Sequence, residues 1–329
     1  MPAVDVAGEF ETIQRLFAPL AHPEWGRGLA DDVAVVPSRP GHDLVLTKDA
    51  IVEGVHFLST DPLDTVARKL MRVNLSDLAA KGAEPFGYLL ACHWSPRCGW
   101  PERMTFVDGL RADQKIFGLA LLGGDTVSTP GPASFSMTLL GWTPNGRTVG
   151  RAGARVGDLV FVTGVIGDGW LGLEAVQDRL PLEAGRLAAL ADHYRTPTPR
   201  TDFALPIRDM ASAAIDVSDG LIADLGHLAE AGRIGIEIDL ETVPLSAAGQ
   251  AWFDDRVDEQ AALEKLVTGG DDYEIAFTAS ARDETALRRE AEHRHLRLTR
   301  IGRVTAGQGV IARLGGQPVS FVRNGFTHG

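Results

Sequence analysis

The second half of the chain follows the order strand, turn, helix and strand, which is typical of an α/β fold. Residues 213–217 read as a strand, and an acidic turn at 218–220 follows directly. The next stretch, 221–232, reads as a helix, and residues 234–240 read as another strand. Strands that alternate with helices build a sheet covered by helices. The sequence therefore predicts an α/β domain in this half of the chain.

The first half also alternates between strand and helix patterns, and the chain of 329 residues is long enough for two domains. We expect a first domain over residues 1–150 and a second over residues 151–329. The stretches 179–200 and 243–259 give no clear pattern. The elements expected in the first half are helices at 9–20, 62–83 and 102–117, and strands at 43–57, 86–92, 119–122 and 135–140.

Charge and composition exclude several classes of protein. The 32 basic and 44 acidic residues give a net charge of −12, and no basic run is present, so nucleic acid is not an expected partner. No stretch reaches the roughly 20 apolar residues of a membrane span, and the N-terminus has no basic and then apolar signal. Cys92 and Cys98 are too few for a disulfide framework. We therefore expect a cytoplasmic protein with reduced thiols that does not bind a membrane.

Aspartates recur beside glycine, serine or threonine, mostly at the ends of apolar strands. Each one alone is adequately explained as a turn former or a helix cap. Together they predict a site, because converging carboxylates raise one another's pKa unless a hard cation compensates their charge. Magnesium is the expected cation, since it shares its ligand shell with water and substrate phosphates. The aspartates are Asp31, Asp32, Asp49, Asp77, Asp125, Asp216, Asp219, Asp271 and Asp272.

The sequence pattern also predicts the local structure around several of these aspartates. Asp49 is expected at a strand end, before a functional loop. Asp77 interrupts an apolar helix face, and Asp125 is expected to be exposed in a turn after two glycines. The turn at 218–220 precedes a helix, whose free N–H groups would be satisfied either by a cap or by a phosphate.

Familiar catalytic motifs are missing from the sequence. It contains no Gly-Lys-Ser/Thr of a P-loop, no G-x-S-x-G and no H-E-x-x-H. The glycines at 164, 167 and 169 do not match the dinucleotide fingerprint, and tight packing explains them. His227 is expected to be structural, whereas His56, which follows Asp49, is a functional candidate. Phe326 either packs against the protein or covers a planar ring.

Eight segments, in order along nearly the whole chain, carry a resemblance to a known family. They are GEF, DD-x-AVV, KD-x-x-VEGVHF, VNLSDLAAKGAEP, LLGGDT, TVGRAGARVGDLVFVTG, AIDVSDGLIADLGH and GGDDYEIAF. Together they closely resemble the thiamine-monophosphate kinase family, in the superfamily of aminoimidazole ribonucleotide synthetase. The resemblance implies a two-domain α/β (α+β) fold and a homodimer in which mixed N-terminal sheets pair. It also implies a kinase that uses ATP and several Mg²⁺ ions to convert thiamine monophosphate into thiamine diphosphate.

The resemblance further assigns roles to individual residues. The magnesium positions are Asp32, Thr47, Lys48, Asp49, Asp77, Asp125, Asp216 and Asp219. The ATP contacts are Phe117, Gly124, Asp125, Arg151 and Ser218, and the substrate contacts are His56, Asp271 and Phe326. The residues expected to be catalytic are Asp49, Asp77, Asp125 and Asp219.

The chemistry that this family performs fits a site built from acids. Phosphoryl transfer depends mainly on alignment and charge neutralisation, which metals held by aspartates and one arginine supply. A phosphate monoester has a second pKa of about 6 and is largely ionised at neutral pH, so its oxygen attacks without a general base. We therefore expect direct in-line attack on the γ-phosphorus, without a phosphoenzyme.

The chain departs from the family pattern at four positions. Ala30 replaces a glycine, Lys48 a threonine, Lys81 a methionine and Asp271 a glutamate. The Lys48 ammonium could repel one magnesium ion, could replace it, or could point away so that only the backbone carbonyl faces the metal. Two other functions stay open: a catalytically impaired protein that binds nucleotide or thiamine phosphate, and a purine-biosynthesis cyclo-ligase of the same superfamily.

Overall fold

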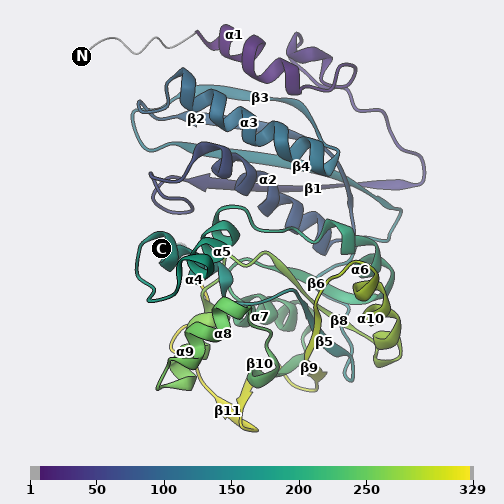
Figure 1. Ribbon diagram of the computed structural model, residues 1–329. Coiled ribbons are helices and arrows are strands. Elements are labelled where there is room, and N and C mark those ends of the chain that lie inside the picture. Colours follow the sequence, from purple (N-terminus) through teal and green to yellow (C-terminus); the bar gives the residue numbers. More distant parts are fainter. Residues whose placement is uncertain (1–7, 327–329) are drawn as a thin grey trace. The chain divides into compact units, whose positions relative to one another are not determined.

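The computed structural model describes residues 8–326 and divides the chain into two compact units. The first unit comprises the residues up to Leu78 together with Glu84–Gly146, and the second comprises Ala79–Ala83 together with the residues from Arg147 onward (Figure 1). Within 8–326, no helix is both long enough and apolar enough to cross a membrane.

The first unit contains a mixed four-stranded sheet in the order β1-β4-β2-β3. Strand β4 lies between β1 and β2 and is antiparallel to both, whereas β3 runs parallel to β2. The mixed sheet confirms the expected fold class. The strands are β1 (His42–Val52), β2 (Glu84–Trp94), β3 (Ala120–Ser128) and β4 (Ser134–Pro144).

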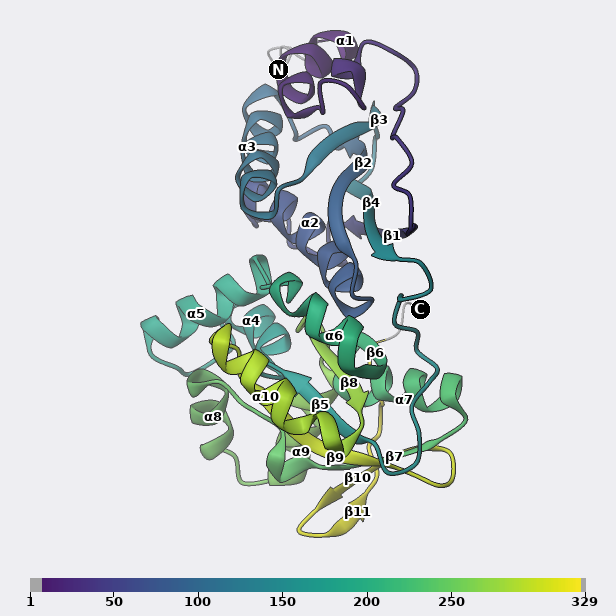
Figure 2. The ribbon, with the colours of Figure 1, turned by 90° about the vertical axis from the view of Figure 1, so that its right-hand side faces the viewer.

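Two long helices, α2 (Leu63–Ala80) and α3 (Trp100–Phe117), cover one face of this sheet (Figure 2). Phe106 of α3 stacks on Phe135 of β4 with ring centroids 4.3 Å apart, and Trp94 of β2 meets both rings edge-on. Residues 9–20 are helical, as expected, in three short pieces. These pieces are α1 (Glu9–Thr12), a π turn (Ile13–Phe17) and a 3-10 turn (Ala18–Leu20), and a further 3-10 turn spans Arg27–Leu29.

Two predictions about local structure in this unit are wrong. Asp49 does not end a strand, because β1 pairs with β4 without interruption and Asp49 lies opposite Met137. Asp125 does not lie in a turn, because Gly124 and Asp125 continue β3 beside β2. Its carboxylate is exposed, as expected. In both cases polar or small residues interrupt the apolar pattern while the hydrogen-bonded ladder continues.

The second unit has a seven-stranded sheet in the order β11-β10-β7-β9-β5-β8-β6. Neighbouring strands are antiparallel except for β7 and β10, which are parallel. The strands are β5 (Leu159–Thr163), β6 (Ala211–Val217), β7 (Gly235–Asp239), β8 (Glu274–Ala279), β9 (Leu298–Thr305), β10 (Gly309–Leu314) and β11 (Gln317–Val319).

Helices cover both faces of this sheet. On one face, Val160 and Val162 of β5 belong to the core that contains Leu225 of α7. On the other face, Phe161 packs in a core with Leu287 of α10. Two of the helices, α5 and α8, lie in the stretches that gave no clear pattern. The helices are α4 (Asp168–Val176), α5 (Ala184–Arg195), α6 (Ala204–Met210), α7 (Leu221–Gly232), α8 (Ala247–Asp254), α9 (Glu259–Thr268) and α10 (Glu284–His293).

Candidate active site

Two residues of β1 and one of α2 form an acidic cluster in the first unit. Because side chains alternate along a strand, Thr47 and Asp49 lie on the same face of β1. The Thr47 hydroxyl donates to Oδ2 of Asp77 on α2. The Asp49 N–H donates to Oδ1 of Asn74, 3.1 Å away, and Asn74 is fully buried one helical turn before Asp77. Asn74 therefore joins β1 to α2 and brings Thr47, Asp49 and Asp77 together.

The electrostatics of this cluster are those of two carboxylates in a poorly solvated place. Burial, together with the charge of Asp77 and a hydrogen bond with Asp77, raises the pKa of Asp49 to about 7. A divalent cation bound beside these carboxylates would compensate their negative charge.

Lys48 does not join this cluster. Its side chain is on the opposite face of β1 from Thr47 and Asp49, and its Nζ donates to Ser136 Oγ on β4, 3.3 Å away. Of the three possibilities left open by the sequence, only the third agrees with this geometry: the ammonium points away from the carboxylates, and the backbone carbonyl alone is left to face a metal.

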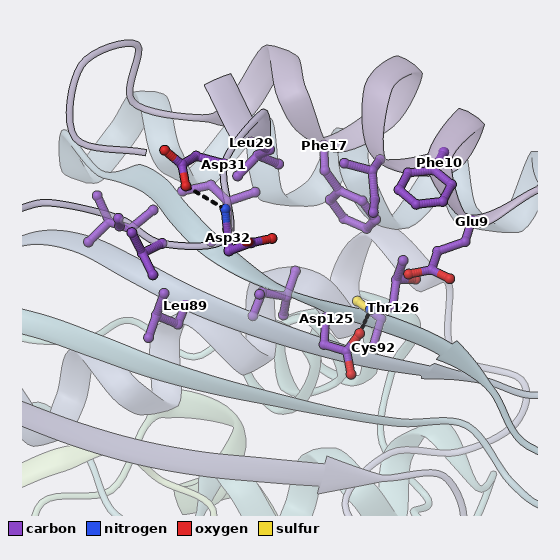
Figure 3. A pocket seen from close by; sticks show the side chains of 18 residues that line it. Glu9, Phe10, Phe17, Leu29, Asp31, Asp32, Leu89, Cys92, Asp125 and Thr126 are labelled. Atoms are coloured by element: carbon purple, nitrogen blue, oxygen red, sulfur yellow. Dashed lines mark hydrogen bonds between the residues drawn. The ribbon is translucent and has the colours of Figure 1, made fainter. Parts of the chain in front are cut away.

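Asp32 and Asp125 line one pocket of the first unit, with a volume of about 360 Å³. Asp32 comes from the loop after Arg27–Leu29, Asp125 comes from β3, and apolar side chains such as Phe10 and Phe17 line the same pocket (Figure 3). The neighbouring Asp31 is exposed, and its ion pair with Arg27 lowers its pKa. Asp31 lines the same pocket as Asp32 and Asp125, but its carboxylate is paired with Arg27.

Three other residues of this unit, Gly124, Phe117 and His56, are expected to contact ligands, and each has its own structural environment. Gly124 lines the pocket, and a Cβ at this position would lie 1.8 Å from the Leu90 carbonyl oxygen, so strand packing itself requires glycine here. Phe117 ends α3 and lies under the guanidinium of Arg72, 5.5 Å from the ring centroid. His56 follows β1, and its Nδ1 accepts the Val52 N–H at 3.1 Å.

In the second unit, the turn of Ser218, Asp219 and Gly220 is held by a carboxylate. All three N–H groups donate to Oδ2 of Asp224, each at 3.1 Å. These three N–H groups precede α7 and are satisfied by Asp224, whereas among residues 8–326 no side chain caps the first turn of α7 itself. The choice between a cap and a phosphate at the start of this helix therefore stays a prediction. Burial and the charge of Asp219 raise the pKa of Asp224 to about 7, although the three backbone hydrogen bonds that it accepts lower it.

The carbonyl groups of the same turn hold two other segments. The Asp271 N–H donates to the Ser218 carbonyl at 2.8 Å, and the Phe326 N–H donates to the Asp219 carbonyl at 2.9 Å. A third bond joins the Tyr273 N–H to the Val217 carbonyl at 2.8 Å. Asp271 and Phe326, 55 positions apart in the printed sequence, are therefore brought to one turn.

The buried acids beside this turn are structural. Asp272 is 1% exposed and accepts the N–H groups of Gly167 and Gly169, each at 3.0 Å, which explains the glycine-rich turn before α4. Burial raises the pKa of Asp272 well above its usual value. Glu274 is equally buried and is paired with Arg200.

The remaining expected residues of this unit are Asp216, which is buried within β6, and Arg151, which is exposed in the loop after β4. Within 8–326, Asp219, Asp224 and His227 form a group whose ligand atoms all lie within 4.8 Å of one another, which is suitable for a cation. The sequence interpretation assigned no role to Asp224. The sequence feature that could have indicated Asp224 is an acidic residue four positions after Gly220, which precedes the helix.

Two family patterns match this chain. The pattern for the AIR synthase related protein N-terminal domain matches residues 30–143, and the one for the corresponding C-terminal domain matches residues 155–315. Escherichia coli HypE shares the fold, with a TM-score of 0.77, 18% identity, and coverage of 97% of this chain and 98% of that one. The fold and both patterns define an AIR synthase related protein.

More similar relatives identify the family within this class. The thiamine-monophosphate kinase of Caulobacter vibrioides is 46% identical over 100% of this chain and 93% of its own length. The structure of the Stenotrophomonas maltophilia enzyme has a TM-score of 0.79 at 36% identity, covering 88% of this chain and 91% of that one. AaThiL complexed with AMPPCP and TMP has a TM-score of 0.77 at 32% identity, covering 91% of both chains. This chain belongs to the thiamine-monophosphate kinase family.

Proposed function

We propose that this protein transfers the γ-phosphoryl group of ATP to thiamine monophosphate and so forms thiamine diphosphate. The observation that carries the proposal is the likeness, over 91% of both chains, to AaThiL complexed with AMPPCP and TMP. AMPPCP is an analogue of ATP, and we take TMP to be thiamine monophosphate. The 46% identity to the Caulobacter vibrioides enzyme over the whole chain supports the same substrates here.

Magnesium is the cation that we propose to accompany the nucleotide. The donor atoms fit this ion, because they are oxygens and Mg²⁺ prefers oxygen ligands. The contact between Asp77 and Asp49, whose pKa is raised, supplies negative charge for a divalent ion to compensate. When bound, the ion would neutralise charge on the transferred phosphoryl group. The positions proposed to hold it are Asp32, Thr47, Lys48 through its carbonyl, Asp49, Asp77, Asp125, Asp216 and Asp219.

The chain's own residues align the two substrates. The attacking oxygen belongs to the monophosphate, which is already ionised near neutral pH because its second pKa is about 6, so transfer proceeds in line without a general base. Arg151 supplies positive charge to the nucleotide phosphates. The proposed catalytic carboxylates are Asp49, Asp77, Asp125 and Asp219, and the proposed nucleotide contacts are Phe117, Gly124, Asp125, Arg151 and Ser218.

Three residues are proposed to contact thiamine monophosphate: His56, Asp271 and Phe326. The chemistry of the ligand suits them, because thiamine combines planar rings with a positive charge. The ring of Phe326 is 48% exposed and can cover a planar ring, and the Asp271 carboxylate can lie near the charge. The aspartate is one methylene shorter than the usual glutamate, which leaves room for a bridging water.

We also propose that the protein is a homodimer of the cytoplasm. Helices α2 and α3 leave one face of the first sheet uncovered (Figure 2). The strand register and the alternation of side chains place three exposed leucines, Leu44, Leu46 and Leu89, on that face. Apolar side chains gathered on an uncovered sheet face favour burial against a second surface. Cys92 and Cys98 are free thiols, as expected for a reducing compartment.

Turnover tests the proposed function. Purified protein is incubated with thiamine monophosphate, ATP and Mg²⁺, and thiamine diphosphate is followed by its fluorescence after oxidation. We expect product only when all three are present. If ATP binds but no product forms over a broad range of Mg²⁺ concentrations, the protein is instead a catalytically impaired binder.

A further inference from the structure

We propose that Asp224 is a positioning residue for thiamine monophosphate, because its carboxylate fixes the turn that holds both Asp271 and Phe326. This inference rests on the substrate roles proposed for Asp271 and Phe326. In this role Asp224 does not contact the substrate, and it is not a metal ligand, although it neighbours residues that are proposed to bind metal.

The N–H side of the turn depends on one oxygen atom. Asp224 is 2% exposed, and its Oδ2 accepts from Ser218, Asp219 and Gly220, each at 3.1 Å. Consecutive N–H groups that converge on one anionic oxygen form a nest, which orders the backbone around it. Without the acceptor, these donors would lose their partner in a poorly solvated place.

Because the peptide bond is planar, the direction of the N–H groups in the turn also sets the direction of its carbonyl groups. Each N–H that Asp224 accepts shares its peptide plane with the carbonyl of the preceding residue, which points in the opposite direction. The three planes therefore carry the carbonyls of Val217, Ser218 and Asp219. These three carbonyls accept from Tyr273, Asp271 and Phe326, in that order. Each of the three peptide groups is therefore hydrogen-bonded to Asp224 through its N–H. Through its carbonyl, it is hydrogen-bonded to a segment that carries a proposed substrate contact.

Both segments depend on this support. Asp271 has φ +65° and Tyr273 has φ +53°, so the first segment is held in the left-handed region, which is unfavourable for residues with side chains. In the second segment, a Cβ added to Gly325 would lie 2.5 Å from Ala223 Cβ and 2.7 Å from the Asp219 carbonyl oxygen. The C-terminal segment therefore packs directly on the turn, and any rotation of the peptide planes would displace it.

The first test compares two substitutions at Asp224. Asp224→Asn keeps an oxygen acceptor, so we expect kcat/KM for thiamine monophosphate within about threefold of wild type, with unchanged half-saturation by Mg²⁺. Asp224→Ala removes the acceptor, and we expect KM for thiamine monophosphate to rise by about 10- to 100-fold. As a matched control, Asp258→Ala removes a carboxylate that accepts one N–H, that of Ala261, and should leave the kinetic constants unchanged.

The second test is a double-mutant cycle. Residues that act through one another give non-additive effects, so Asp224→Ala should raise KM much less in a chain that already carries Asp271→Ala and Phe326→Ala. A purely structural role would give additive effects and overturn the inference.

Two further outcomes would contradict the positioning role of Asp224. If Asp224→Asn raises the Mg²⁺ requirement about tenfold, Asp224 is a metal ligand, and this result is decisive even if the alanine variant does not fold. If Asp271→Ala and Phe326→Ala both leave KM unchanged while wild type forms product, the inference fails together with the substrate roles, and the kinase function stands.

Discussion

At the scale of residues, the cluster of Thr47, Asp49 and Asp77 depends on which face of a strand each side chain occupies. The sequence predicted that carboxylates gather and raise one another's pKa, and Asp49 beside Asp77 does so. It did not predict the direction of Lys48. That direction depends on β1 being continuous, since consecutive side chains of an unbroken strand face opposite sides.

Asp77→Asn should remove activity while keeping the fold. Asparagine retains an oxygen that accepts from Thr47, but it removes the negative charge from the cluster, so we expect kcat to fall by roughly 100- to 1,000-fold. Steady-state kinetics and a thermal unfolding curve measure the two properties. Asp64→Asn, in the first turn of the same helix, is the matched control and should behave as wild type. Full activity of Asp77→Asn would remove Asp77 from the proposed catalytic residues.

The raised pKa of Asp49 predicts how stability depends on pH without metal. The folded pKa is about 7 and the ordinary value is 3.8, so the folded state favours the protonated carboxyl. The stability that this preference contributes is present at low pH and is lost as pH rises between these two values. We expect a loss of roughly 2–4 kcal/mol from this group.

Asp49→Asn measures this contribution, because asparagine does not titrate. The free energies of unfolding of wild type and Asp49→Asn are compared in a chelator at about pH 5 and about pH 8. The wild type should lose stability relative to the variant as pH rises, and Mg²⁺ should restore it. Parallel pH profiles for the two proteins would contradict the assignment.

At the scale of elements, two glycines and an aspartate in β3 show why a turn was predicted wrongly. Gly123, Gly124 and Asp125 have the composition of a turn, yet they pair with β2. Close approach of the two strands explains Gly124, and only the neighbouring strand reveals that constraint. In contrast, α2, α3 and α7 were predicted close to their observed bounds, since their periodicity is local to each segment, whereas α5 and α8 were not predicted.

Gly124→Ala should destabilise the first unit. The added Cβ would lie 1.8 Å from the Leu90 carbonyl oxygen, so β2 and β3 must separate, which we expect to lower the free energy of unfolding by about 3 kcal/mol. Gly123→Ala is the matched control, because its Cβ would meet only Leu89 Cδ2 at 3.4 Å and should change stability by less than about 1 kcal/mol. Chemical denaturation measures both, and equal stabilities of the two variants would contradict the packing argument.

At the scale of the whole molecule, the sequence predicted the fold class and the family, but not every connection. The strand, turn and helix order of 213–240 identified the α/β fold, and the motifs along the chain identified the family. Two features required the structure: Ala79–Ala83 belongs to the second unit although it ends a helix of the first, and Asp271 and Phe326 meet at one turn. Contacts between distant segments leave no periodic signal in a single sequence.

The uncovered leucine face predicts the oligomeric state. Light scattering coupled to size exclusion should give twice the 35.2 kDa mass of one chain. Leu46 is 57% exposed, and Leu46→Asp should shift the protein to the mass of one chain, because a charge would then be buried in the interface. A wild-type monomer, or an unchanged mass for the variant, would contradict the proposed pairing of sheets.

The transfer of labelled phosphate tests the proposed reaction most directly. ATP that is radiolabelled in its γ-phosphoryl group is mixed with the protein, Mg²⁺ and thiamine monophosphate, and the label is followed into each product. We predict that the label appears in thiamine diphosphate, in equal amount to the thiamine monophosphate consumed, and that the protein itself stays unlabelled. Label found only in inorganic phosphate, or held covalently on the protein, would contradict direct transfer from ATP to thiamine monophosphate.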